Sequence, residues 1–73
     1  MSSPRTETVD IVLNGEPRGV AAGSVADLLR ELGVPAGRVA VEVDRRIVRR
    51  QEWESTRLTP GARVELVHFV GGG

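Results

Sequence analysis

The chain has 73 residues, a length that allows one small domain and leaves no room for a second core. Ten acidic residues balance ten arginines, so the formal net charge is zero and no overall field favours nucleic acid or a membrane as a partner. The absence of cysteine excludes a disulfide framework and a thiolate metal site. No apolar run approaches the ~18 residues of a membrane span, and residues 1–10 lack the apolar region of a signal peptide, so we expect a cytoplasmic protein.

A hairpin is expected near the start of the chain. Apolar and polar residues alternate over 9–13, a pattern that predicts a strand. Asn14 and Gly15 follow, and this pair is a strong signal for a two-residue hairpin turn because both residues tolerate positive φ. We predict the return strand over 18–21, with Pro17 limiting the pairing before it.

One amphipathic helix is expected next. Ser24 is a good N-cap, and apolar residues recur at i, i+3, i+4 and i+7 from Val25. Gly33 has the usual place of a C-terminal cap, and Pro35 prevents the helix from resuming. The pattern predicts a helix of two to three turns over 25–32, too short to be stable unless it packs against the hairpin.

The second half of the chain is expected to be mostly strands. We predict strands over 39–43 and 62–70, a brief strand at 47–48, and an irregular or single helical turn over 51–56. Trp53 lies in that turn and is expected to pack in the core or cover an edge. These elements predict an α+β fold, in which a mixed sheet of four to five strands carries one main helix on one face.

The sequence contains few of the side chains that enzymes use for catalysis, and those present lack suitable partners. His68 is the sole histidine, and Ser24 and Ser55 occupy cap or turn positions without a nearby base. Asp27 and Glu31 share the polar side of the expected helix, where a solvated face is favoured over acid–base work. No set of residues has the spacing of a metal site. We therefore expect that the chain is not itself an enzyme.

The basic residues concentrate between positions 38 and 50. They are Arg38, Arg45, Arg46, Arg49 and Arg50. Acidic residues are interleaved with them and aromatic residues are nearly missing, so a solvated face is favoured over docking to an acidic partner and over RNA binding. RNA binding would show a steep dependence on salt.

The chain finishes with three glycines, 71–73, after an apolar strand. Three extended residues reach roughly 10 Å, so the Gly73 carboxylate could enter another protein's active site while the folded body stays outside. Val67 and Phe69 are expected on the outer face of the last strand, where together with Val70 they predict a protein-docking surface. The alternatives are a frayed end and an outer face covered by a loop or by the leader.

Four stretches together resemble the thiamine-biosynthesis sulfur carrier family (ThiS), which has the ubiquitin-like β-grasp fold. The stretches are 13–16 (Leu-Asn-Gly-Glu), 25–33, 41–53 and 64–73. The resemblance covers roughly 11–73. The third stretch typically reads Val-Asn-x-x-Ile-Val-Pro-Arg-x-x-Trp, and here Asp44 replaces the asparagine and Arg49 the proline. The pattern is kept at Ile47, Val48, Arg50 and Trp53.

The resemblance implies that the Gly73 carboxylate is the group that reacts and that Gly72 is required beside it. It also implies that Gly71 and Gly72 thread into the partner's site. An E1-like (ThiF-like) adenylating enzyme would join the Gly73 carboxylate to AMP from ATP. Sulfur from a donor protein would then displace AMP to leave a thiocarboxylate, and thiazole synthase (ThiG-like) would take this sulfur for the thiazole of thiamine. The chain itself would bind no cofactor.

Residues 1–8 are polar and include Pro4, so we expect a disordered leader there, followed by a β-grasp domain over 9–70 and a flexible glycine tail over 71–73. Two related functions stay open beside the thiamine carrier. One is the small subunit of molybdopterin synthase, a sulfur carrier for the molybdenum cofactor. The other is a ubiquitin-like modifier attached to lysines of target proteins.

Overall fold

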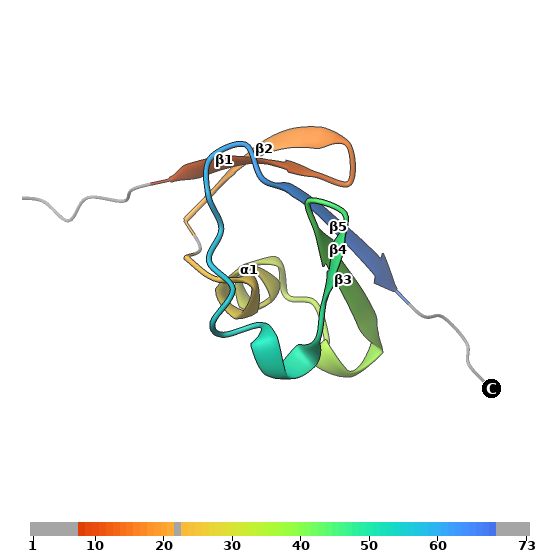
Figure 1. Ribbon diagram of the computed structural model, residues 1–73. Helices are drawn as coiled ribbons and strands as arrows, with labels where there is room; N and C mark the ends of the chain where they lie inside the picture. The colour runs from red at the N-terminus through yellow and green to blue at the C-terminus, as the bar shows by residue number, and fades with distance from the viewer. Residues whose placement is uncertain (1–7, 22, 69–73) are drawn as a thin grey trace, which may run out of the picture.

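The computed structural model describes residues 8–21 and 23–68, which form one mixed sheet with a helix packed on one face (Figure 1). The elements in chain order are β1 (Val9–Leu13), β2 (Glu16–Val20), α1 (Val25–Leu32), a 3₁₀ turn (Ala36–Arg38), β3 (Val39–Val43), β4 (Arg46–Val48), a second 3₁₀ turn (Arg50–Glu52) and β5 (Arg63–His68). The strand order is β2-β1-β5-β3-β4. Only β1 and β5 run parallel, and the other neighbours are antiparallel. This arrangement confirms the predicted α+β architecture.

The first hairpin forms as predicted but is longer than expected on its second strand. Asn14 and Gly15 have φ values of 49° and 84°, as a two-residue turn of this kind requires. However, β2 begins at Glu16, two residues before the predicted start. Pro17 lies opposite Val12 within the pairing. An edge strand such as β2 accommodates proline because its outer side needs no N–H donor.

The helix α1 has the predicted ends. The Ser24 hydroxyl accepts a hydrogen bond from the Asp27 N–H at 3.1 Å, which satisfies one of the free donors of the first turn. Gly33 adopts the left-handed conformation with φ of 71°, and its N–H returns to carbonyls of the last turn. Because isolated helices this short are marginal in water, its stability comes from packing against the sheet.

The hydrophobic core lies between α1 and the face of the sheet that the helix covers. Its buried residues are Ile11, Val20, Val25, Ala26, Leu28, Leu29, Val39, Val41, Val48, Trp53, Leu58, Ala62 and Val64. The prediction that Trp53 packs in the core is confirmed, since only 6% of it is exposed. Its indole Nε1 donates a hydrogen bond to the Val48 carbonyl at 3.0 Å, so the polar atom is satisfied where it is buried.

Candidate functional site

The candidate site is organised around β5, the strand that leads to the glycine tail. Most of the predicted site lies outside the described residues, namely Phe69, Val70, Gly71, Gly72 and Gly73. Their roles remain predictions. The described part of the site is therefore the strand that holds the tail and the face of the sheet beside it.

The two hairpin turns both hold β5 through an Asn or Asp residue with positive φ. Asn14 donates its N–H to the Val64 carbonyl at 2.9 Å, and its Oδ1 accepts from the Leu66 N–H at 2.9 Å. Asp44 donates its N–H to the Arg63 carbonyl at 2.7 Å, and its Oδ1 accepts from the Arg63 N–H at 3.0 Å. The strand before the tail is thus fixed on both sides by side chains as well as by ladder bonds.

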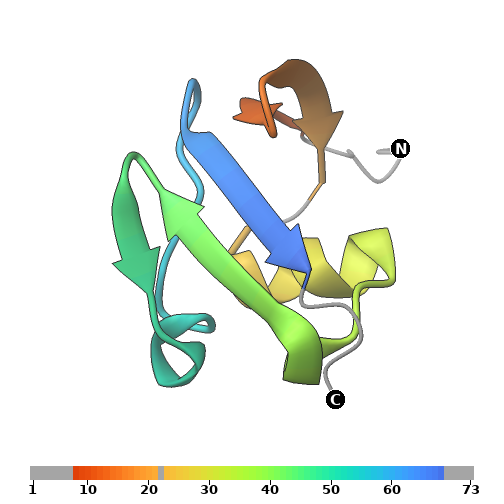
Figure 2. The ribbon, with the colours of Figure 1, turned by 90° about the vertical axis from the view of Figure 1, so that its right-hand side faces the viewer.

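Val67 points outward, as the sequence predicts. It pairs with Ala40 across β3 and β5, while the neighbouring pair of Val41 and Leu66 faces the helix. Val67 is 54% exposed. We use the name open face for the sheet surface turned away from α1, which Figure 2 shows toward the viewer with the helix behind it. The docking role of Val67 stays a prediction.

Sequence reasoning missed other members of the open face. Ile47 lies opposite Glu42, and Glu42 lies opposite Glu65, so these side chains form one row across β4, β3 and β5. Ile47 is 74% exposed. The signal was present in the alternation, because Val48 is the core residue of that strand and its neighbour must face away. The pairing of the two glutamates depends on strand register and has no local signal.

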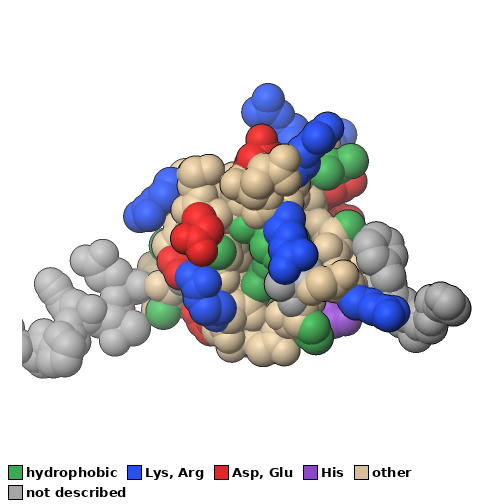
Figure 3. Space-filling model, turned by 90° about the horizontal axis from the view of Figure 1, so that it is seen from below, with side chains coloured by type: hydrophobic (Ala, Val, Ile, Leu, Met, Phe, Trp, Pro, Cys, Tyr) green, Lys and Arg blue, Asp and Glu red, His purple; other side chains and the backbone are tan. Residues whose placement is uncertain are grey.

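The basic residues at positions 38–50 are all exposed and come from separate elements. They extend from the first 3₁₀ turn through β4 to the start of the second 3₁₀ turn. On the face shown in Figure 3, basic and acidic side chains are interspersed around a hollow that exposes hydrophobic side chains. This arrangement agrees with the interpretation of the arginines as a solvated face.

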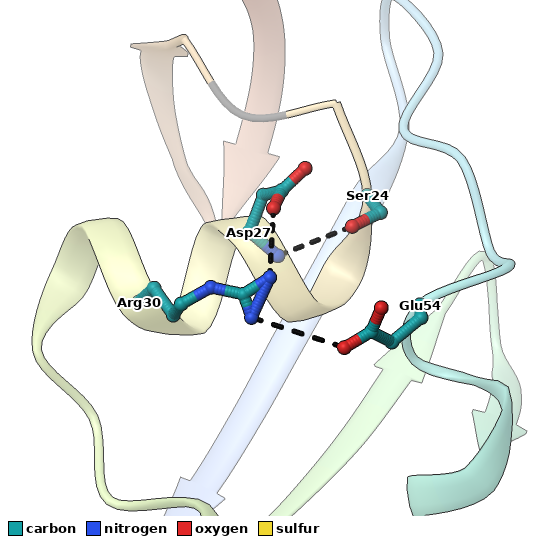
Figure 4. A network of polar contacts seen from close by, with 4 residues as sticks. All are labelled: Ser24, Asp27, Arg30 and Glu54. Carbon is teal, nitrogen blue, oxygen red and sulfur yellow. Dashed lines mark hydrogen bonds and ion pairs between the residues drawn. The ribbon is translucent and has the colours of Figure 1, made fainter.

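The helix carboxylate Asp27 takes part in a surface network and not in a catalytic pair (Figure 4). Arg30 contacts it at 3.0 Å and reaches Glu54 at 3.9 Å. All three side chains are well exposed, so the two ion pairs contribute little to stability. The other helix carboxylate, Glu31, accepts a hydrogen bond from the Ala21 N–H at 3.2 Å. Both predicted surface carboxylates therefore bind groups of the chain itself.

Two of the hollows on the described part of the chain have volumes of about 470 and 240 Å³. The larger is lined by Val43, Asp44, Arg46, Ile47, Val48, Glu52, Ser55 and Thr56. The smaller is lined by Ala26, Leu29, Arg30, Val34, Arg50, Trp53 and Glu54. His68 lies outside both, exposed at the end of β5. Over 8–21 and 23–68, no group of three His, Asp or Glu side chains has the arrangement of a metal site, and no helix is long and apolar enough to cross a membrane.

Comparison with known families and structures identifies close similarities. The model of the ThiS family matches residues 11–73. The crystal structure of the thiamine biosynthesis protein ThiS from Geobacter metallireducens has a TM-score of 0.74 and 33% identity, covering 89% of this chain and 100% of that one. An NMR structure of a thiamine biosynthesis protein from the same organism has a TM-score of 0.74 and 32% identity, and the match covers 89% of this chain and 88% of that one. The predicted ubiquitin-like β-grasp fold is thereby confirmed.

Two thiazole synthases also match, from Paramagnetospirillum magneticum and Magnetococcus marinus. Each is 41% identical over 64 residues, which cover 86% of this chain. The chain spans about a fifth of the length of these relatives, since the matched region is 20% of each.

Proposed function

Because the chain belongs to the ThiS family, we propose that it is a sulfur carrier protein of thiamine biosynthesis. The observation that supports this proposal most directly is that the family match runs to residue 73 and so includes the three glycines. The similarity to the Geobacter thiamine biosynthesis protein supports the same pathway. The chain would be a co-substrate of other enzymes and not a catalyst. We also propose that it acts in the cytoplasm.

The proposed chemistry takes place at the Gly73 carboxylate. A carboxylate is a poor electrophile, so an E1-like adenylating enzyme first joins it to AMP from ATP and releases pyrophosphate. Sulfide supplied by a donor protein then attacks the carbonyl carbon, AMP leaves with the electron pair of the broken C–O bond, and a thiocarboxylate remains. Gly71 and Gly72 would thread into the partner's site, since residues without Cβ suit a narrow passage. Orientation and charge stabilisation would come from the partner enzymes, which explains why the carrier needs no catalytic side chains.

The proposed recipient of the sulfur is thiazole synthase. Support comes from the two thiazole synthases, because a fifth of each of these proteins is similar to this chain. In that step the thiocarboxylate sulfur attacks the substrate, the bond between the sulfur and the Gly73 carbonyl carbon then breaks, and the oxygen of a water molecule adds to that carbon to restore the carboxylate. ATP is consumed by the adenylating partner, and the carrier binds no cofactor of its own.

The proposal is tested by intact-mass analysis after incubation with ATP, a sulfur source and the adenylating enzyme of the same organism. We expect the mass to increase by the difference between one sulfur and one oxygen atom. A variant that lacks Gly73 is the control and should gain nothing. No mass change in the wild type, or an equal change in the control, would show that the proposal is wrong.

A further inference from the structure

The smaller hollow lies between α1 and the segment that contains the second 3₁₀ turn. Its apolar lining consists of Ala26, Leu29, Val34 and Trp53. Three of these residues are buried members of the hydrophobic core, and Val34 is half-buried. No lining residue comes from β5, so a molecule bound in the hollow would leave the strand before the tail free.

Hydrogen bonds join the two walls of this hollow directly. The Ala26 N–H, in the first turn of α1, donates to the Trp53 carbonyl at 3.0 Å, and the Val25 N–H donates to the Thr56 carbonyl at 3.0 Å. The Trp53 indole is fixed in turn by its hydrogen bond to the Val48 carbonyl. The hollow is therefore formed before a ligand arrives, and binding costs little in the ordering of its walls.

The rim of the hollow carries an arginine that forms no ion pair with the rest of the described chain. Arg30 contacts Asp27 at 3.0 Å and Glu54 at 3.9 Å (Figure 4). Arg50 also lines the hollow and is exposed, but both ion pairs among residues 8–21 and 23–68 are those of Arg30. An incoming carboxylate would be attracted by Arg50 and repelled by Glu54, so the rim favours one place for a negative charge.

The volume of the hollow suits one large side chain better than a whole small molecule. Sites for drug-sized molecules usually have about 300–1,000 Å³, and this hollow has a volume of about 240 Å³. A cavity of about 150 Å³ is large enough for a benzene ring. An aromatic ring or a leucine side chain therefore fits, with the backbone that carries it outside the hollow.

We propose that the smaller hollow binds an acidic segment of a partner protein, which inserts one large apolar side chain and places a neighbouring carboxylate on Arg50. Apolar anchors that fill pockets contribute much of the free energy of protein–protein binding. The planar guanidinium of arginine can donate two parallel hydrogen bonds to a carboxylate. Trp53 adds an aromatic surface against which the anchor packs.

The test follows the amide NMR shifts of the isotope-labelled full chain during titration with short peptides. The acidic peptide is acetyl-Glu-Phe-Glu-amide. Acetyl-Gln-Phe-Gln-amide lacks its charges, and acetyl-Glu-Ala-Glu-amide lacks its anchor. We expect the acidic peptide to give saturable shifts at Ala26, Leu29 and Trp53, and each of the other two to bind at least about fivefold more weakly. The fluorescence of Trp53, the single tryptophan, gives a second measure of binding.

Three variants separate the contributions of charge and shape. Arg50→Gln should weaken binding of the acidic peptide about fivefold and leave that of the neutral phenylalanine peptide within about twofold, because only the charged peptide uses the guanidinium. Arg63→Gln is the matched control, since it removes an exposed arginine from the open face and should bind as the wild type does. Val34→Phe should weaken binding of both phenylalanine peptides, because its ring would fill the hollow. Arg50 is exposed, so Arg50→Gln tests the inference even if Val34→Phe does not fold.

The inference is overturned if the acidic peptide gives no saturable shift at the hollow up to about 10 mM, or if Arg50→Gln binds it as the wild type does. Binding of 3-phenylpropionate as tight as that of the acidic peptide would assign the hollow to free organic acids and would also overturn it. Self-association of the wild type that shifts the same amides, with no effect of the peptide, would assign the hollow to a second copy and overturn it too. None of these outcomes depends on the reaction proposed at Gly73, so the two proposals are tested separately.

Discussion

The side-chain oxygen of Asn14 accepts a hydrogen bond from the backbone N–H of Leu66 at 2.9 Å, across 52 residues of sequence. The parallel pairing of β1 and β5 covers only two residue pairs and ends at Leu13 and Val64. Asn14 extends this short ladder by one further contact, with its side chain in place of a backbone carbonyl. The first hairpin is thereby tied to the strand that leads to the tail.

Asn14→Gly should weaken this attachment without creating backbone strain, because glycine tolerates the φ of 49° found here. We expect a loss of about 1 kcal/mol in the free energy of unfolding, the usual net value of one hydrogen bond. The more specific readout is amide hydrogen exchange, in which the Leu66 N–H should exchange faster. Asn14→Asp keeps the acceptor and is the control. Unchanged protection of Leu66 in Asn14→Gly would contradict the assignment.

Arg45→Gly should stabilise the protein. Arg45 has a φ of 70° in the turn between β3 and β4, a conformation that costs a non-glycine residue about 1–2 kcal/mol. Part of this gain is offset by the greater freedom of glycine in the unfolded chain. We therefore expect the free energy of unfolding, measured by urea titration, to increase by about 0.5–1 kcal/mol. Arg49→Gly is the matched control, since its φ of −74° leaves no strain to relieve and the change should destabilise.

Local chemistry predicts the parts of this fold that depend on a few neighbouring residues. The Asn14-Gly15 turn and the caps at Ser24 and Gly33 were predicted correctly because each depends on the conformation of one or two residues. The start of β2 was predicted wrongly because Pro17 was treated as a barrier to pairing. Its tolerance depends on β2 being an edge strand, which is a property of the whole sheet.

The candidate site divides in the same way. The outward position of Val67 follows from alternation along one strand and was predicted. The opposition of Glu42 and Glu65 depends on the register of two strands that residues 44–62 separate in the chain. The second contact of Asn14 depends on the neighbours of β5. No local pattern specifies these non-local relationships, since register is set by the burial of one whole face.

Ser24→Ala should destabilise α1. The Ser24 hydroxyl is the N-cap acceptor for the Asp27 N–H, and the residue is only 4% exposed, so water cannot readily replace the lost bond. We expect a decrease of about 1–2 kcal/mol in the free energy of unfolding, measured by urea titration. Ser55→Ala is the control, because Ser55 is exposed and its change should stay within about 0.5 kcal/mol. Equal effects of the two substitutions would argue against a capping role.

Trp53→Phe should lower the free energy of unfolding by more than the loss of buried apolar area alone would. The indole donates to the Val48 carbonyl at 3.0 Å, and phenylalanine fills part of the space but has no N–H. The carbonyl of a buried strand residue would then lose a partner, at a cost of about 1–3 kcal/mol.

The measurement is urea unfolding followed by circular dichroism, since Trp53 is the single tryptophan and its fluorescence is lost with the substitution. Trp53→Ala should cost about 3–5 kcal/mol, the usual range for removal of a large aromatic residue from a core. A Phe variant as stable as the wild type would show that the hydrogen bond to Val48 contributes nothing. The expected order of stability is wild type above Phe above Ala, because the Phe variant loses the hydrogen bond and part of the packing, whereas the Ala variant loses the hydrogen bond and most of the packing.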